Sequence, residues 1–512
     1  MEDILIQFAK LQIFSQFWLS FFLLIPLVLI SRTVVAGTKY SPILLIVVFG
    51  LAMGYFLVTS GVSEPGLSEF TIIELLSRTT TIALIASFFI GGQELRKVFG
   101  KKHVEPDDSI ILSHDEVSVG TNRTQLIHII RTFFLLLGIE TAYRSIVGIN
   151  DGYSSRYYPL LAYICLVCSI ILIDNKAIIR NKKLYKKKGF REILVIILIL
   201  IVTFYISEWF KPVIALPQIF FVMVITSCLG AIFYKMHIGP TMKSLLFAGL
   251  PIVLASNFII GGSKVAEAFG IAGINSVLAF GFFGQIIWMF GGIALLMFFA
   301  KTFNVRNLAP GLAGGLSHAG LTGACTAGDL GKVAAHRAPI MINLPFVAHI
   351  FVFAILAVSS ERGELTMFPA LAILTLGIIL VLLSLRTLKT ANGDDSKEII
   401  SLMKFSLGWQ IVAIFGGFVL LSVFGMSFNL VSASVTSSLS HFGLFAATQG
   451  GMFGVEVADL LPFIFAMPFL VHPFVFFLFG KAMEKDGNMP STPVYVLVAI
   501  GILGVIYALI SI

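Results

Sequence analysis

The chain has 512 residues, of which 57% are hydrophobic and only 12% are charged, and its mean hydropathy is +0.97. Soluble domains carry about 25% charged residues, so this composition excludes an ordinary soluble protein. The formal net charge of +8 does not indicate nucleic-acid binding. Most of the excess lies in loops between apolar runs, as membrane topology would require.

Apolar runs of about 20 residues recur along the chain, and such runs cross roughly 30 Å of hydrocarbon as helices. The alternation typical of a membrane barrel is absent, so helices must satisfy the backbone inside lipid. We therefore predict an all-α polytopic membrane protein with about 14 transmembrane helices, in a bacterial inner membrane. The expected spans lie near 14–31, 42–60, 72–92, 125–147, 157–174, 192–207, 213–234, 244–260, 272–300, 338–358, 367–385, 405–426, 460–480 and 491–511.

Residues 316–353 are repeated, without a gap, as residues 439–476. The two stretches begin LSHAGLTGACTAG and LSHFGLFAATQGG, and 16 of the 38 aligned positions are identical. Roughly 3 identities would be expected by chance for apolar sequence. The repeated pairs, each 123 residues apart, include His318 with His441 and His349 with His472. The chain therefore contains a duplicated unit.

The distribution of Lys and Arg predicts how the repeats lie in the membrane. The loop 175–191 holds eight of these residues and is expected in the cytoplasm. If the glycine-rich run 308–328 crossed the membrane, the basic loop 386–404 would fall outside. If the run instead dips in and returns, every loop obeys the charge rule, so we predict a re-entrant hairpin. Three full spans per repeat then invert the second copy, and its hairpin, 430–453, enters from outside.

These arguments divide the chain into three parts. Residues 1–260 are expected to form an N-terminal bundle of about eight helices, with a cytoplasmic loop at 93–124. Residues 272–390 form the first transport repeat and residues 405–512 the second, inverted repeat. Sequence repeats of inverted topology are typical of secondary transporters, whose substrate site lies between the repeats. We detect no equivalent repeat in the first part, which would be a scaffold, a dimerisation domain or a diverged half of the transport core.

Small polar residues of the two hairpins are the candidate substrate-binding residues, because glycines let the backbone approach a ligand and hydroxyls offer donors and acceptors. They are Ser317, His318, Thr322 and Thr326 in the first hairpin and Ser440, His441, Thr448 and Gln449 in the second. The alternative is that each histidine only fixes its hairpin to its own bundle.

Acidic residues beside the hairpins, Asp329 and Glu456, are candidates for ion coupling, since ionisable groups near membrane depth are costly and often functional. Ordinary positions in interfacial loops are the alternative, and Asp329 and Lys332 could also pair with each other. For His349 and His472, in the middle of apolar spans, packing and proton relay both remain open.

Two N-terminal stretches carry a family resemblance. SPILLIVVFGLAMGYFL (41–57) followed by IALIASFFIGGQELRK (82–97) resembles the opening helices of cation:proton antiporters and sodium/glutamate symporters. The glycine-rich hairpins are similar to those of the sodium/glutamate symporters and related carboxylate carriers. The electrogenic antiporters bind their cation with an Asp-Asp or Asn-Asp pair, and no such pair lies in the middle of an expected span here. The symporters' Gly-His-Gly signature is also missing, so no residue is transferred from either family.

These observations predict a sodium- or proton-coupled secondary transporter of a small organic anion, such as an amino acid or a carboxylate. A cation:proton antiporter and a passive channel are the alternatives. P-loop, HExxH and nucleophile-elbow motifs are absent from the sequence, so we expect no enzymatic activity. No cofactor or nucleic-acid partner is predicted. The expected partners are the solute, the coupling cation and the lipid bilayer, with a bound Na⁺ and a homodimer left open.

Overall fold

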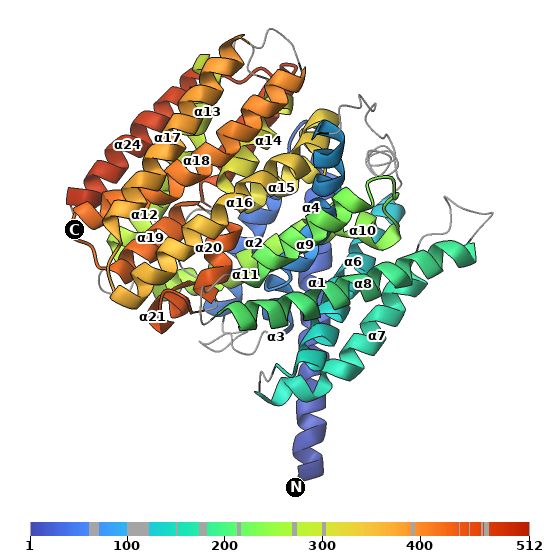
Figure 1. Cartoon of the computed structure of the whole chain (residues 1–512). Helices are drawn as coiled ribbons and strands as arrows, with labels where there is room; N and C mark the ends of the chain where they lie inside the picture. Colours follow the sequence, from blue (N-terminus) through green and yellow to red (C-terminus); the bar gives the residue numbers. More distant parts are fainter. Residues whose placement is uncertain are drawn as a thin grey trace.

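The computed structural model of the chain consists of helices, drawn in Figure 1. It describes residues 2–60, 71–99, 122–149, 152–173, 182–211, 217–268, 274–299, 304–390, 395–439, 441–449, 451–461, 464 and 470–510. All regular elements in these ranges are helical, apart from two isolated β-bridges.

The elements follow one another in two halves. The first half contains α1 (Glu2–Val35), α2 (Ile43–Thr59), α3 (Thr71–Ser77), α4 (Thr80–Phe99), α6 (Asn122–Val147), η2 (Gly152–Tyr157), α7 (Tyr158–Ile171), α8 (Lys182–Phe210), α9 (Gln218–Ile232), α10 (Pro240–Ser244), the π-helical η3 (Leu245–Gly249) and α11 (Leu250–Ala268). The second half contains α12 (Ile274–Ile286), the π-helical η4 (Ile287–Gly291), α13 (Gly292–Phe299), α14 (Val305–Leu316), α15 (Ala319–Thr326), α16 (Lys332–Arg362), α17 (Met367–Thr390), α18 (Asp395–Val423), α19 (Phe428–Leu439), α20 (Phe442–Gln449), α21 (Val455–Asp459), α23 (His472–Glu484) and α24 (Ser491–Ile510).

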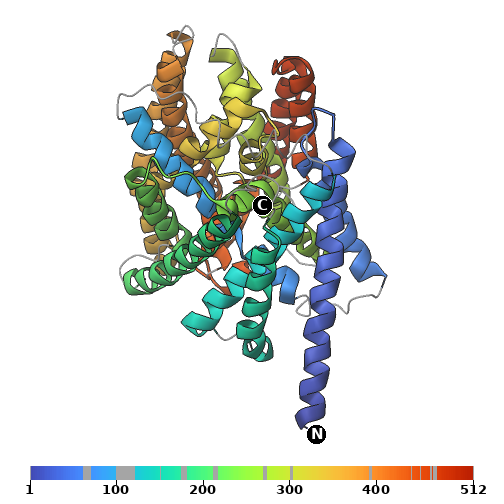
Figure 2. The ribbon, with the colours of Figure 1, turned by 90° about the vertical axis from the view of Figure 1, so that its right-hand side faces the viewer.

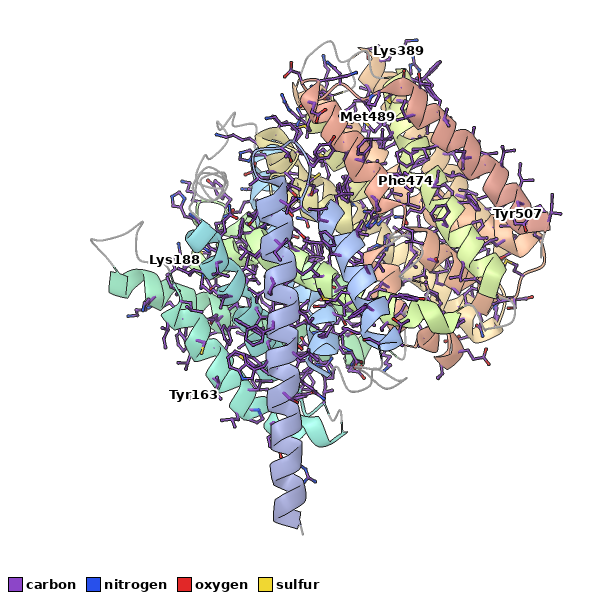
Figure 3. All side chains as sticks on the ribbon, turned by 180° about the vertical axis from the view of Figure 1, so that it is seen from behind. Tyr163, Lys188, Lys389, Phe474, Met489 and Tyr507 are labelled. Atoms are coloured by element: carbon purple, nitrogen blue, oxygen red, sulfur yellow. The ribbon has the colours of Figure 1, made fainter. Side chains whose placement is uncertain are left out.

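The helices have the length and composition of membrane spans. Nine helices among the described residues are long and apolar enough to cross a membrane, and the bent pair within α16 raises the number to ten. Large apolar side chains such as Phe368, which is 85% exposed, cover the outer surface, and Figure 3 shows Tyr163 and Tyr507 pointing outward on opposite sides. The chain is therefore a helical, membrane-embedded protein. The larger number of spans stays a prediction. Three of the expected spans are apolar helices of only 10–17 residues (Ile43–Thr59, Ser155–Ile171 and Gln218–Ile232), and the expected span at 460–480 falls partly on residues outside the described ranges.

The duplication in the second half is also visible in the backbone. Helices α14 and α19 both have 12 residues, and α15 and α20 both have 8. The glycines that follow adopt positive φ in both copies: 81° at Gly328 and 73° at Gly451, then 92° at Gly331 and 95° at Gly454. Only glycine adopts this conformation readily, which explains why the repeat keeps it at these positions.

Each pair of short helices turns back on itself. A Cβ added to Gly331, after α15, would lie 3.8 Å from Arg306 at the start of α14. The equivalent distance in the second copy, from Gly454 to Asn429, is also 3.8 Å. The two pairs are thus helical hairpins, called here hairpin 1 (α14–α15) and hairpin 2 (α19–α20).

The two repeats exchange contacts reciprocally. Helix α17 of the first repeat packs on α18 of the second, while α24 of the second packs on α12, η4 and α13 of the first. Hairpin helix α14 likewise packs on α18, and α19 packs on α12. Such an exchange of equivalent partners means that the repeats are related by an approximate two-fold rotation.

The first half contains a second duplication. Residues 71–100 align with 241–270 without a gap, and 11 of the 30 positions are identical, including the Gly-Gly pairs at 91–92 and 261–262. In the structure α4 begins at Thr80 and α11 begins at Leu250, and these two starts are 170 residues apart, as the alignment requires. This repeat was not detected in the sequence above, where a scaffold, a dimerisation domain and a diverged half of the transport core were all left open. The wide spacing of the copies, with α6, η2, α7, α8 and α9 between them, hid the signal.

Glycines hold this second pair of units together in the same reciprocal way. Helix α2 packs on α11, where a Cβ on Gly54 would overlap the Ile259 carbonyl oxygen. Helix α9 packs on α4, where a Cβ on Gly230 would overlap the equivalent carbonyl oxygen of Phe89. Such close approach through small residues is typical of helix pairs in membranes.

The two halves of the chain contact each other through equivalent pairs of helices. Helix α2 packs against α23 and α15, and its counterpart α9 packs against α16 and α20, which are the equivalents of those two helices. In Figure 1, α4 and α9 lie beside α16, where the blue-to-green part of the chain meets the yellow-to-red part. Figure 2 shows α1 extending past the rest of the bundle at its N-terminal end. The centre of the molecule is thus formed by both halves.

Candidate functional site

The two hairpins meet at their tips. His318 and His441, which the duplication pairs in sequence, form an isolated antiparallel bridge, and the amide of Phe442 donates to the carbonyl oxygen of Ser317 at 3.4 Å. Ser317 adopts the left-handed conformation with φ 47° and ends α14, so the chain can turn into α15 within two residues. The approximate two-fold axis that relates the repeats therefore passes between these two histidines.

Each hairpin histidine caps the helix that follows it. Nδ1 of His318 accepts the amide hydrogen of Leu321 at 3.1 Å. Nδ1 of His441 accepts the amides of Gly443 at 3.1 Å and Leu444 at 3.2 Å. Since Nδ1 is an acceptor in both rings, the neutral imidazoles must carry their proton on Nε2.

A histidine from the opposite repeat faces each of these Nε2 atoms. Nε2 of His318 lies 2.6 Å from Nε2 of His472 on α23. Nε2 of His441 lies 3.1 Å from Nε2 of His349 on α16. All four rings are at most 1% exposed. Each pair thus joins the hairpin of one repeat to a long helix of the other, and we name them pair 1 (His318 with His472) and pair 2 (His441 with His349).

A glutamine completes each pair. The carboxamide nitrogen of Gln285 on α12 lies 2.7 Å from Nε2 of His318 and 3.3 Å from that of His472. That of Gln410 on α18 lies 2.8 Å from Nε2 of His441 and 3.1 Å from that of His349. The sequence analysis missed both glutamines. Each stands five residues before a repeated Phe-Gly-Gly, and this shared spacing could have revealed them.

Two glycines make room for the rings. A Cβ on Gly320 would lie 3.1 Å from Cε1 of His472, and one on the equivalent Gly443 would lie 2.9 Å from Cε1 of His349. Both distances are shorter than ordinary carbon–carbon contacts of about 3.5–4.0 Å. The glycine after each Ser-His therefore has a steric function in the pairing of the repeats.

The predicted hydroxyl residues lie around the tips with different partners. The hydroxyls of Ser317 and Thr322 are buried and make no hydrogen bond in the described part of the chain. Thr326 and Thr448 instead donate to carbonyl oxygens of their own helices, Thr326 to Thr322 at 2.8 Å and Thr448 to Leu444 at 2.8 Å. Of these four candidates, Ser317 and Thr322 therefore have a hydroxyl that is available to a ligand in this conformation.

The two remaining candidates of hairpin 2 are not settled by the structure. Ser440 lies outside the described residues, and Gln449 is the last residue of α20, with a side chain that is not described. Helix α19 contributes three further buried hydroxyls without a partner among the described residues, which the sequence analysis did not single out: Ser432, Ser434 and Ser437.

The two acidic candidates lie away from the histidine pairs. Asp329 follows hairpin 1, and its Oδ2 accepts the hydroxyl of Ser41 at 2.6 Å. Arg32, at the end of α1, interacts electrostatically with the same carboxylate and donates to the Phe247 carbonyl oxygen at 2.7 Å. Glu456 is exposed in the first turn of α21. The structure thus does not bring the acids and the histidines into one cluster.

The donors present do not resemble a metal centre. Within the described ranges, no group of three or more His, Cys, Asp or Glu side chains is arranged to hold a metal ion.

Comparison of the chain with models of protein families, with curated protein sequences and with solved structures finds no match. The geometry of the site is therefore the basis for any functional conclusion.

Proposed function

We propose that the chain is an ion-coupled secondary transporter of a small organic anion, such as an amino acid or a carboxylate. The observation that carries this proposal is the meeting of two helical hairpins, from repeats related by an approximate two-fold rotation, at His318 and His441. Broken helices that meet at the interface of two repeats are typical of secondary transporters, in which one bundle moves against the other around a central site.

The proposed topology has about 14 spans, with hairpin 1 re-entrant from the cytoplasm and hairpin 2 from outside, in a bacterial inner membrane. Contacts at the two ends of the bundle support it. At the end with many basic residues, Asn304 forms a bridge with Asn488, and Arg337 pairs with Glu398 at 3.2 Å. At the opposite end, the hydroxyl of Ser360 donates to the carbonyl oxygen beyond α20 at 2.6 Å. Each contact joins segments that the positive-inside rule puts on one side.

An anion is the favoured solute because of what surrounds the tips. The N-terminal ends of α15 and α20, which start at Ala319 and Phe442, both lie there, and helix N-termini favour negative charge. The buried hydroxyls of Ser317 and Thr322 can donate hydrogen bonds to carboxylate oxygens. Asp329 is the proposed acid near the cytoplasmic end of hairpin 1, while a coupling role for the exposed Glu456 stays a prediction.

Uptake into proteoliposomes tests the proposal. The purified chain is reconstituted, and accumulation of radiolabelled glutamate and succinate is measured under an imposed sodium gradient, an imposed pH gradient or neither. We expect accumulation above the equilibrium level with one gradient only. Accumulation that never exceeds equilibrium would indicate a channel, and cation movement without either solute would indicate an antiporter. Ser317→Ala and Thr322→Val should weaken uptake, and Thr375→Val, on the outer helix α17, serves as the control.

A further inference from the structure

The geometry of the two histidine pairs points to a proton-coupling site. We infer that each pair takes up one proton beyond its neutral state, and that this proton separates a hairpin of one repeat from the long helix of the other. The inference rests on the proposed function and specifies its coupling ion. The histidine pairs thereby take the ion-coupling role that the sequence suggested for Asp329 and Glu456.

Counting protons in pair 1 defines the neutral state. Nδ1 of His318 accepts the Leu321 amide, so the proton of this ring is on Nε2 and points at His472 Nε2, 2.6 Å away. His472 accepts that proton and must therefore carry its own proton on Nδ1. The same reasoning assigns Nε2–H to His441 and Nδ1–H to His349, because the Nδ1 atom of His441 also caps its helix.

A third proton does not fit this arrangement. Placed on Nε2 of His472, it would face the Nε2–H of His318 at 2.6 Å, which brings two donors together. Placed on Nδ1 of His318, it would face the amide hydrogen of Leu321 and uncap α15. Either location removes a hydrogen bond that holds hairpin 1 in place. Uptake of a proton and movement of the hairpin are therefore linked by geometry.

The glutamines supply the acceptor that the third proton needs. The carbonyl oxygens of Gln285 and Gln410 are buried and make no hydrogen bond within the described part of the chain. The Nε2–H of His318 and the amide nitrogen of Gln285, 2.7 Å apart, would both be donors, so the neutral state already requires the amide orientation that places the oxygen against this ring. An amide oxygen accepts two hydrogen bonds, so both Nε2–H groups of a protonated pair can donate to it once the two rings have moved apart.

Aromatic rings and the two glutamines lie beside the pairs. On pair 1, α11 contributes the Phe258 ring, 6.3 Å from that of His472, and α12 contributes Gln285. On pair 2, Phe353 of α16 lies 5.3 Å from the His349 ring, and α18 contributes Gln410. Among the described residues, His441 interacts electrostatically with His349, and His318 interacts with His472. Charge brought by a proton is thus felt mainly within the pair.

The approximate two-fold symmetry gives the two pairs opposite effects. Pair 1 holds the hairpin that we place on the cytoplasmic side, and pair 2 holds the hairpin that we place on the outer side. A proton that enters one pair loosens one hairpin while the other remains closed. Alternate protonation of the two pairs would therefore open one side at a time, as alternating access requires.

Nitrogen-15 NMR of the full chain in lipid vesicles tests the site without any solute. Signals are assigned by their loss in His472→Gln and His349→Gln. At neutral pH we expect two rings protonated on Nε2 and two on Nδ1. At lower pH we expect a doubly protonated ring in each pair, which His472→Gln removes from pair 1 and His349→Gln removes from pair 2. Four rings of one tautomer, or rings that take no proton over the pH range in which the protein stays folded, would overturn the inference.

Vesicles loaded with the pH dye pyranine test the coupling. Proton movement per glutamate or succinate is measured for the wild type, for His472→Gln and for the control His128→Gln in α6. We expect the ratio of protons to solute to fall at least about tenfold in His472→Gln, because pair 1 can then no longer bind the third proton, and to stay the same in the control. An unchanged ratio in His472→Gln, or wild-type uptake driven by sodium alone, would refute proton coupling while leaving the transporter function intact. A wild type that moves neither solute would refute the proposed function, and the NMR result would still decide whether the pairs bind protons.

Discussion

Replacing Gly92 by alanine tests the second duplication, because this glycine lies where α4 touches α9. A Cβ at this position would overlap the Ser227 carbonyl oxygen. A carbon atom needs about 3.3 Å from such an oxygen, so the two helices would have to separate by more than about 1 Å. Overpacking of this kind typically costs about 1–3 kcal/mol. We expect a loss of that size in the free energy of unfolding.

The symmetry makes this prediction stricter. Gly262 on α11 contacts the Leu51 carbonyl oxygen of α2 in the equivalent way, so Gly262→Ala should cost a similar amount. Gly291 is the matched control, since a Cβ there would meet its nearest atom at 3.9 Å, which is ordinary contact. Chemical unfolding in detergent micelles, followed by fluorescence, measures all three variants. If Gly92→Ala and Gly262→Ala are as stable as Gly291→Ala, the glycine contacts do not hold the helices together and the reasoning fails.

Two further predictions concern buried polar contacts. Glu140→Ala should lower the free energy of unfolding by about 3–5 kcal/mol, because it removes the carboxylate that lies 2.6 Å from the buried Arg144. The control Glu208→Ala, at an exposed ion pair, should cost less than about 1 kcal/mol in the same unfolding measurement. Equal losses in the two variants would argue against the prediction. A double-mutant cycle of Asp329→Ala and Ser41→Ala should yield a coupling of about 1.5–3 kcal/mol, as for hydrogen bonds to charged groups. Additive losses would mean that this contact does not stabilise hairpin 1.

Much of the second half could be predicted from the sequence because its signal is local. The duplicated Ser-His at 317 and 440 and the glycines around it identified two equivalent turns, and the structure describes two matching hairpins there. What could not be predicted is which histidine meets which. Pairing of His318 with His472 is a contact between repeats over 154 residues of chain, and no periodicity within one segment carries that information.

The first half was misinterpreted for a related reason. Its copies at 71–100 and 241–270 are 170 residues apart, and they meet only in the folded structure, where α3 packs on α11 and α4 packs on η3. The glutamines were missed because a single buried amide among apolar residues looks like ordinary packing until its partners are known.

Thiol labelling in intact cells tests the central claim, that the two hairpins enter the membrane from opposite faces. Single cysteines are introduced as Met452→Cys, just beyond hairpin 2, and Asn488→Cys, beside the start of hairpin 1, in a variant without the four native cysteines. A membrane-impermeant maleimide should label position 452 in intact cells and position 488 only after permeabilisation. Labelling of both positions from the same side would contradict the inverted arrangement and the shared site at the hairpin tips.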